Sequence, residues 1–115
     1  MSDLTELRDR MREFTEEREW AQFHDPKSLI LALVGEVGEL AELFQWLPAE
    51  RAAQLAGADP LRRRVGEELA DVLLYLVRLA DVLEVDLASV AERKLAGGKE
   101  RYPAADFHGH APKKG

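Results

Sequence analysis

Apolar residues recur at intervals of three and four along two long segments, and this period limits the fold more than any other feature of the sequence. The first stripe consists of Leu29, Leu33, Val37, Leu40, Phe44 and Leu47, and the second of Leu61, Val65, Leu69, Val72, Leu76, Leu79 and Leu83. Such spacing places side chains on one face of an α-helix, and no segment shows the alternation expected of a strand. We therefore expect an all-α fold whose core is made by these two stripes.

Acidic residues mark the expected starts of four helices. They are Asp3, Asp25, Asp59 and Asp86. Proline follows two of them, in the first helical position, where its missing N–H is no loss. We expect the first helix to reach about Trp20 and the last to fray at Gly97 and Gly98, which are poor residues for a helix interior. The sequence thus predicts a four-helix bundle, with room for a short helical turn between residues 48 and 58.

The chain length of 115 residues is that of one compact domain, and it is small enough for a helical fold to gain from oligomerising. We expect residues 1–104 to form this domain. Residues 105–115 are rich in Pro, Gly, His and Lys and are expected to form a mobile tail. His108 and His110 lie in that tail, where we expect them to be inert.

Composition excludes several classes of function. The chain has no cysteine, so a bound metal would have to be held by oxygen or histidine ligands. A net charge of -6 argues against binding to nucleic-acid backbones. The longest apolar stretch, residues 29–34, is far shorter than the roughly 18 residues of a membrane span, and the first residues lack the pattern of a signal peptide. We therefore expect a cytoplasmic protein that binds neither membranes nor nucleic acid.

Two pairs of acidic residues interrupt the apolar helices: Glu36 with Glu39, and Glu68 with Asp71. A separation of three residues lets both carboxylates of a pair point to the same side of a helix. If the helices pack antiparallel, as their short connection favours, the carboxylates of the two pairs face one another and raise some of their pKa values. One such pair would usually indicate a solvated face. Two pairs on successive helices instead predict a site for Mg²⁺, with Mn²⁺ as a substitute.

Aromatic residues lie on the same stripes as the acids. Trp46 follows Glu39 by two turns, and Tyr75 follows Asp71 by one turn. A single aromatic residue on a helix is more often part of the core. A metal site beside flat rings, however, suits a nucleotide, because ions bind its phosphates and rings stack on its base.

Three segments carry a resemblance to a known family. They are "EFTEEREWAQFHDPKSLILALVGEVGELAELFQW", "EELADVLLYLVRLADVLEVDL" and "KLAGGKERYP". Together they resemble the all-α NTP pyrophosphohydrolases of the MazG-like superfamily over residues 13–104, and within that superfamily the dCTP pyrophosphatase branch. The family's Glu-x-x-Glu and Glu-x-x-Asp motifs, which hold magnesium, are met by Glu36, Glu39, Glu68 and Asp71. The resemblance implies cleavage of a nucleoside triphosphate between the α and β phosphates, with Glu36 or Glu39 as the candidate base.

The resemblance also implies which residues contact the substrate. Trp20, His24, Trp46 and Tyr75 would line the base and sugar pocket, joined by Arg78 on the stripe of Tyr75, while Lys94, Arg101 and Tyr102 would contact phosphate. Trp46 could be supplied by a neighbouring subunit. The third helix is apolar around most of its circumference, and we therefore expect a homodimer or homotetramer.

The nucleotide preference rests on fewer residues than the chemistry. Gly98 stands where the dCTP-hydrolysing relatives carry an asparagine, so one side-chain contact to the nucleotide is missing or replaced. Cleavage of dCTP or of a related, modified pyrimidine nucleotide is the expected function. Two alternatives stay open: the same reaction on dUTP or on mixed noncanonical nucleotides, and a noncatalytic helical oligomerisation module whose acids bind a structural ion.

Overall fold

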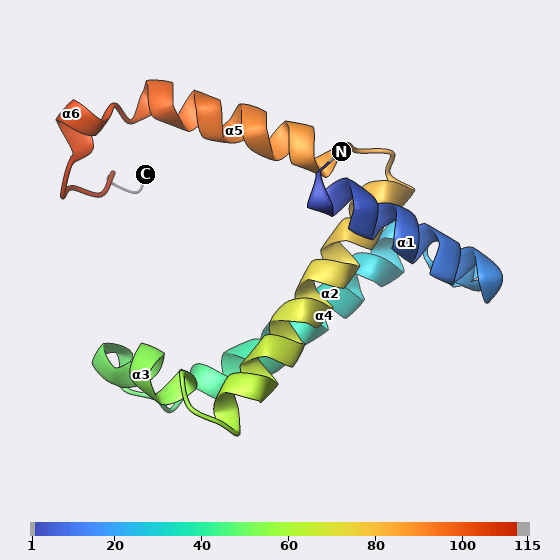
Figure 1. Ribbon diagram of the computed structural model, residues 1–115, viewed down its shortest axis with the longest axis horizontal. Helices are drawn as coiled ribbons and strands as arrows, with labels where there is room; N and C mark the ends of the chain where they lie inside the picture. Colours follow the sequence, from blue (N-terminus) through green and yellow to red (C-terminus); the bar gives the residue numbers. More distant parts are fainter. Residues whose placement is uncertain (1, 113–115) are drawn as a thin grey trace.

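A computed structural model gives the fold of residues 2–112, and every element in this range is helical (Figure 1). Four long helices account for most of it: α1 (Asp3–Glu17), α2 (Pro26–Phe44), α4 (Leu61–Val82) and α5 (Leu87–Arg101). The shorter elements are η1 (Trp20–Phe23), η2 (Ala49–Arg51), α3 (Ala52–Ala56) and α6 (Ala104–Phe107). The expected all-α class is confirmed, and η2 with α3 supplies the short helical turn predicted between residues 48 and 58.

Two of the predicted helix starts are capped as expected. The side chain of Asp25 accepts a hydrogen bond from the backbone N–H of Ser28 at the start of α2. At the start of α5, the side chain of Asp86 accepts one from the backbone N–H of Ser89. Each bond satisfies a donor that has no partner within its own helix. These caps fix where the helices that follow η1 and α4 begin.

Helix α1 begins at Asp3 as predicted, whereas α4 begins one residue later than its predicted cap implies. Ser2 caps α1, which leaves Asp3 inside the first turn, where its negative charge favours the helix dipole. Pro60, not Asp59, is the N-cap of α4, and no side chain caps that helix. Its backbone is already in the helical region, and its carbonyl accepts a hydrogen bond from the N–H of Arg64.

Two predicted helix ends also differ from the structure. The first helix ends at Glu17 because Glu19 adopts a positive φ of 55°, and Trp20 then opens η1. Helix α5 runs through Gly97 and Gly98 instead of fraying there, and ends at Arg101. The penalty of about 1 kcal/mol for each glycine in a helix is therefore overcome by the rest of α5.

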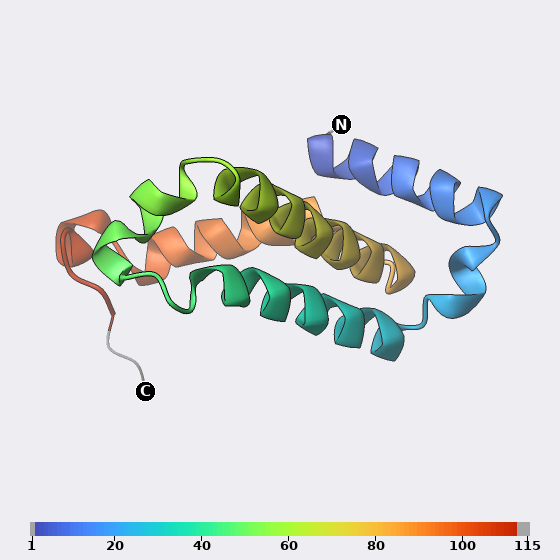
Figure 2. The same cartoon turned by 90° about the horizontal axis from the view of Figure 1, so that it is seen from below.

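Within residues 2–112 the helices do not close into a four-helix bundle. Helices α2 and α4 run antiparallel along each other (Figure 2), and α1 packs across α4 (Figure 1). After α4, helix α5 contacts α1 and then extends away from the α2–α4 pair (Figure 1). None of the described helices is both long and apolar enough to cross a membrane.

The expected tail begins inside a further element. Helix α6 covers residues Ala104–Phe107, and the ring of Phe107 packs edge-on against Tyr102 with 5.2 Å between ring centres. Residues 113–115 of that tail lie outside the described residues. The domain boundary at residue 104 stays a prediction.

The predicted core stripes are only partly buried. Leu29 and Val77 are the buried apolar side chains in the described chain, whereas Val37, Leu69 and Leu76 are exposed. The acids Glu36 and Glu68, by contrast, face one another across the α2–α4 contact, as predicted for antiparallel helices. The predicted assignment of the apolar faces is therefore wrong in part. Both helices carry apolar residues on several sides, and periodicity alone then leaves their rotation about the helix axis open.

A second apolar surface lies on one side of the α2–α4 pair. It is formed by Ile30, Val34 and Val37 of α2 and by Leu69, Leu73 and Leu76 of α4, which are between 39% and 61% exposed. Each trio follows a three- and four-residue spacing, and at 3.6 residues per turn each stripe lies about a quarter turn, in the same direction, from the half-buried face of its helix. In an antiparallel pair such stripes lie on the same side. We call these residues the outer apolar face.

The chain is more open than a monomer of its size. Its accessible surface is 9113 Å², whereas about 6,300 Å² is typical of a folded monomer of 12.9 kDa. The radius of gyration is 17.5 Å, against about 13 Å for a compact domain of this length. The fold therefore exposes much more surface to solvent than a compact single-chain domain of the same size does.

Candidate metal and nucleotide site

Three of the predicted acids meet where α2 and α4 face each other. Glu36 and Glu39 of α2 and Glu68 of α4 each present one carboxylate oxygen, and these oxygens lie within 4.8 Å of one another. Glu36 and Glu68 are half-buried, and Glu39 is exposed. The group consists of oxygen donors only, open to solvent on the Glu39 side, and could hold a hard divalent cation.

The electrostatics of this acid cluster are unfavourable without a cation. One carboxylate oxygen of Glu36 and one of Glu68 are buried and accept no hydrogen bond. The pKa of Glu36 is raised to about 7, first by the hydrogen bond its protonated form can make with Glu68, then by desolvation, and further by Glu39 and the charge of Asp71. Buried polar oxygens without partners are uncommon in folded proteins. A divalent cation would satisfy both oxygens and remove the repulsion.

The fourth predicted acid, Asp71, lies one turn beyond Glu68 and lines a cavity of about 480 Å³ between α1, α4 and the start of α2. Trp20, His24, Tyr75 and Arg78 line the same cavity. The ring of Trp20 is held edge-on against Phe14 of α1, with 5.6 Å between ring centres. The structure thus brings together four predicted nucleotide contacts, and it places them beside an acid whose charge reaches the cluster.

A series of polar and charged side chains leads away from this cavity, starting at His24 and Arg78 in its wall. The guanidinium Nε of Arg78 donates a hydrogen bond of 3.0 Å to Nδ1 of His24, and Nη1 of Arg78 contacts Asp81 at 3.3 Å. Arg12 of α1 binds both oxygens of Asp81: its Nε donates to Oδ2, which also accepts from Arg78, and its Nη2 donates to Oδ1. Arg78 is buried, with 8% of its surface exposed. These contacts join α1, α4 and the segment before α2.

Comparison of the sequence with models of protein families identifies the family of this chain. The sequence profile of the MazG nucleotide pyrophosphohydrolase domain matches residues 24–105, which include the four predicted acids and six of the twelve residues that line the cavity. The chain belongs to the MazG nucleotide pyrophosphohydrolase domain family. The resemblance stated from the sequence is therefore confirmed.

Curated relatives of this MazG-family chain carry the name dCTP pyrophosphatase 1. The protein from Bos taurus is 47% identical over 110 residues, which cover 96% of this chain and 65% of the relative. The protein from Homo sapiens is 48% identical over 101 residues, which cover 88% of this chain and 59% of the relative. The chain thus spans less than two thirds of the length of each of these relatives.

A solved structure shares the fold. A pyrophosphatase from Archaeoglobus fulgidus matches 90% of this chain and 94% of its own, with 36% sequence identity and a TM-score of 0.79. At this similarity the two proteins share one arrangement of helices.

A second cavity opens on the other side of the acid cluster. It has a volume of about 630 Å³ and is lined by Glu39 and Glu68 together with Arg64. Arg64 lies on the acid stripe of α4, and the cavity brings its positive charge to the same opening as the two carboxylates. The cluster therefore faces open space where a substrate and water could reach it.

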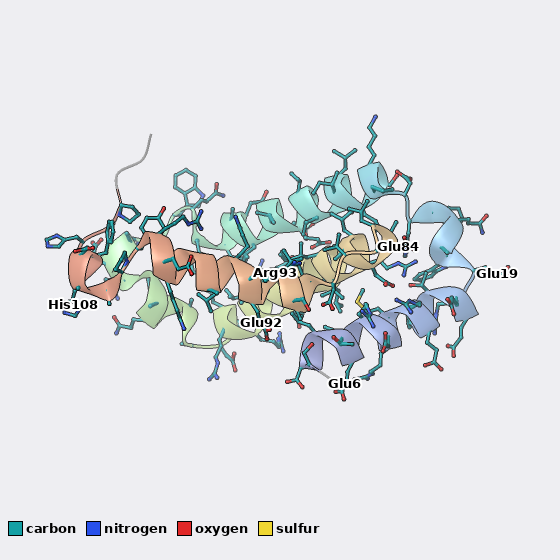
Figure 3. All side chains as sticks on the ribbon, turned by 90° about the horizontal axis from the view of Figure 1, so that it is seen from above. Glu6, Glu19, Glu84, Glu92, Arg93 and His108 are labelled. Carbon is teal, nitrogen blue, oxygen red and sulfur yellow. The ribbon has the colours of Figure 1, made fainter. Side chains whose placement is uncertain are left out.

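Trp46 and the predicted phosphate contacts lie elsewhere in the chain. Trp46 follows the end of α2 and is 86% exposed. Lys94 and Arg101 line a separate cavity of about 540 Å³ on α5, which also includes Arg93, labelled in Figure 3. Tyr102 packs against Phe107 and not against the acid cluster. Their contacts with a nucleotide stay predictions, and within one chain these residues do not join the acids.

Figure 3 places His108 at the α6 end of the molecule, opposite the turn at Glu19. His24, by contrast, ends the short helix η1 that follows that turn. Of these two histidines, His24 alone lines the cavity that contains Trp20 and Asp71.

The sequence did not indicate Arg12 and Asp81 as parts of the site. They stand 69 positions apart, and each on its own is an ordinary charged residue on an amphipathic helix. The only available signal was that Asp81 falls three residues after Arg78 on α4, a spacing that permits an ion pair. The link to α1 required the tertiary structure.

Proposed function

We propose that the protein is a magnesium-dependent nucleoside triphosphate pyrophosphohydrolase. It cleaves dCTP, or a related and modified pyrimidine deoxynucleotide, to the monophosphate and pyrophosphate, and so removes unwanted nucleotides from the pool. The observation that carries this proposal is the acid cluster of Glu36, Glu39 and Glu68 adjoining Asp71 in an aromatic-lined cavity. Membership of the MazG family and the names of the curated relatives support it.

The residues present fit a magnesium ion. Glu36, Glu39, Glu68 and Asp71 would hold it, because the buried oxygens of Glu36 and Glu68 lack partners and the whole set offers oxygen donors. When bound, Mg²⁺ supplies charge neutralisation of the triphosphate and lowers the pKa of water. Mn²⁺ has similar ligand preferences and is the expected substitute.

The chain's own residues bind and orient the nucleotide. Trp20 and Tyr75 offer ring faces for the base, and His24 offers a polar contact in the same cavity. The apolar part of the wall excludes water from the base, so that attack is confined to the end of the cavity nearest the acids. Glu39 is the exposed acid of the cluster and can accept a proton from the attacking water, with Glu36 as the alternative base.

We further propose that the working protein is a homodimer or homotetramer. The surface of one chain exceeds that of a typical monomer by about 2,800 Å², which is more than each partner buries in an interface of standard size. The outer apolar face is the surface of α2 and α4 that a second copy would cover. Such an assembly also fits the small number of buried apolar side chains in the single chain.

Assembly also accounts for the predicted contacts that lie away from the acid cluster. Trp46 is almost fully exposed, and Lys94 and Arg101 lie on α5, which extends away from the α2–α4 pair (Figure 1). We propose that Trp46, Lys94, Arg101 and Tyr102 contribute to the nucleotide site of a neighbouring copy. Positive charge from α5 would then meet the phosphates beside the acids.

Magnesium-dependent release of pyrophosphate, measured over a panel that includes dCTP, dUTP and the other nucleoside triphosphates, tests the proposed reaction. We expect turnover with dCTP, and loss of turnover in Glu39→Gln and in Asp71→Asn with the fold retained. Glu67→Gln is a matched control, since Glu67 lies beside Glu68 on α4 but pairs with Arg63 at the surface. Full activity in Glu39→Gln or Asp71→Asn would contradict the metal placement. A lack of turnover with every triphosphate would refute the proposed reaction and leave the noncatalytic oligomerisation module as the remaining hypothesis.

Gly98 allows a test of the cytosine preference. An added Cβ at Gly98 meets no atom within 4 Å, and the same is true of its neighbour Gly97. Gly98→Asn should therefore fold and raise the preference for dCTP over dUTP, whereas Gly97→Asn should not. Equal effects of the two substitutions would remove position 98 from the determinants of specificity and favour the alternative substrates.

A further inference from the structure

A series of hydrogen bonds behind the nucleotide cavity connects the surface of α1 to a histidine in the cavity wall. Asp81 has 8% of its side chain exposed and accepts hydrogen bonds from both Arg12 and Arg78. The hydrogen bond from Arg12 is the largest cause of a lowered pKa at Asp81, and the charges of Arg12 and Arg78 lower it further. Arg78 in turn donates through Nε to Nδ1 of His24. Each group therefore fixes the orientation of the next.

The last hydrogen bond determines where the proton of His24 lies. Arginine has no acceptor, so Nδ1 of His24 must carry a lone pair, and a neutral ring then has its proton on Nε2. Burial lowers the pKa of His24, and the charge of Arg78 lowers it further, so the ring is neutral near pH 7. His24 can therefore donate a hydrogen bond through Nε2 and has no other N–H to offer.

We propose that Asp81 is a positioning residue for nucleotide binding, and that Arg78 acts through His24 and not by contacting the substrate itself. Asp81 and Arg12 hold the guanidinium of Arg78, Arg78 fixes the Nε2–H form of His24, and His24 donates that proton to an acceptor on the base or sugar. The base of a pyrimidine nucleotide presents carbonyl and ring-nitrogen acceptors of this kind. The proposal rests on the proposed function, because it names the contact that the same cavity makes.

Two features support a role beyond structure. A buried ion pair whose only task is to join α1 to α4 needs Arg12 and Asp81 alone, yet the guanidinium of Arg78 spans Asp81 and an imidazole at the cavity. The donors of Arg78 that are bonded in this way point to protein groups, which leaves it poorly placed to bind phosphate. A histidine whose proton position is fixed before the ligand arrives also avoids the cost of ordering it on binding.

The substitution Asp81→Asn tests the proposal with two readouts. Nitrogen-15 shifts of His24 report which ring nitrogen carries the proton, and His24→Gln identifies its signals among those of His108 and His110. We expect the wild type to show the Nε2–H form and Asp81→Asn to show a mixture of forms. The KM for dCTP should rise about ten-fold with little change in kcat, as loss of one charged hydrogen bond predicts.

Asp9→Asn is the matched control. Asp9 also accepts two hydrogen bonds from one arginine, Arg8, but it lies at the surface of α1. It should leave the His24 form and KM unchanged. If Asp81→Asn does not fold, Arg12→Gln removes the exposed end of the same contacts and should shift both readouts in the same direction, with Arg63→Gln as its control.

Binding of dCMP, measured by calorimetry without metal, separates this proposal from the proposed function. If the wild type does not hydrolyse dCTP but Asp81→Asn mixes the His24 forms and weakens dCMP binding, the proposed reaction fails and the positioning role stands. If Asp81→Asn retains the Nε2–H form, or lowers kcat with KM unchanged, the positioning role is overturned whatever the activity of the wild type.

Discussion

Truncation of one residue on the outer apolar face should weaken assembly by a calculable amount. Leu73 is 40% exposed in the single chain. Full burial of a leucine side chain stabilises by about 1.5–3 kcal/mol, so burial of the remaining part by a second copy contributes about 1 kcal/mol. In a two-fold interface each substitution counts twice, and Leu73→Ala should cost about 2 kcal/mol, or about 30-fold in the dissociation constant.

Sedimentation velocity over a range of protein concentrations measures this change. Arg63→Ala is the control, because Arg63 is also on α4 but lies at the solvated surface, where its side chain is 73% exposed. It should leave the dissociation constant within about two-fold of the wild type. A dissociation constant for Leu73→Ala equal to that of Arg63→Ala would mean that this face is not the interface. A wild type that stays monomeric at every concentration would refute the assembly itself.

Three further predictions concern the acid cluster. The folded state keeps a proton on Glu36 up to about pH 7, whereas the unfolded chain loses it near pH 4.5, so the metal-free protein should lose stability as pH rises between these values. Glu36→Gln should flatten that slope in urea unfolding, and an unchanged slope would assign the effect to another group. Mg²⁺ at one hundred times its dissociation constant should raise the free energy of unfolding by about 2.7 kcal/mol, and Glu68→Gln should remove most of this gain; a gain of equal size in the variant would place the ion elsewhere. If α5 completes a neighbour's site, mixing inactive Glu39→Gln with inactive Lys94→Ala chains should restore about a quarter of the activity, whereas no recovery after subunit exchange would confine the site to one chain.

The sequence predicted the elements of this fold better than their rotation. Helices at Asp25 and Asp86 begin where capping chemistry places them, because a cap is a local interaction between a side chain and the next turn. The rotation of α2 and α4 about their axes was predicted wrongly in part, because Val37 and Leu69 of the predicted core stripes are exposed, whereas Glu36 and Glu68 face each other as predicted. A helix that is apolar on several sides offers more than one face for packing, and only the tertiary structure selects one.

The candidate site divides in the same way. Glu36, Glu39 and Glu68 were recognisable because their spacing and their helix neighbours are sequence features, and the structure brings them together. Asp81 and Arg12 were not, because an ion pair between α1 and α4 joins residues 69 positions apart that share no pattern. Local periodicity thus predicts which groups share one helix face, whereas the partners of that face on other helices have to be read from the packing.

The position of the acids should make the stability of the folded chain depend on its ligands. Carboxylates in the α2–α4 contact weaken the contact that holds the chain together. Among the described residues, the buried apolar side chains are those of Leu29 and Val77. A cation between Glu36 and Glu68, and a second copy on the outer apolar face, would each bind the folded chain and not the unfolded one, and each would therefore add to its stability. Because both act on the same folded state, assembly and metal binding should favour one another. The stability that the acids remove from the single chain would then be restored only in the assembled, metal-bound protein.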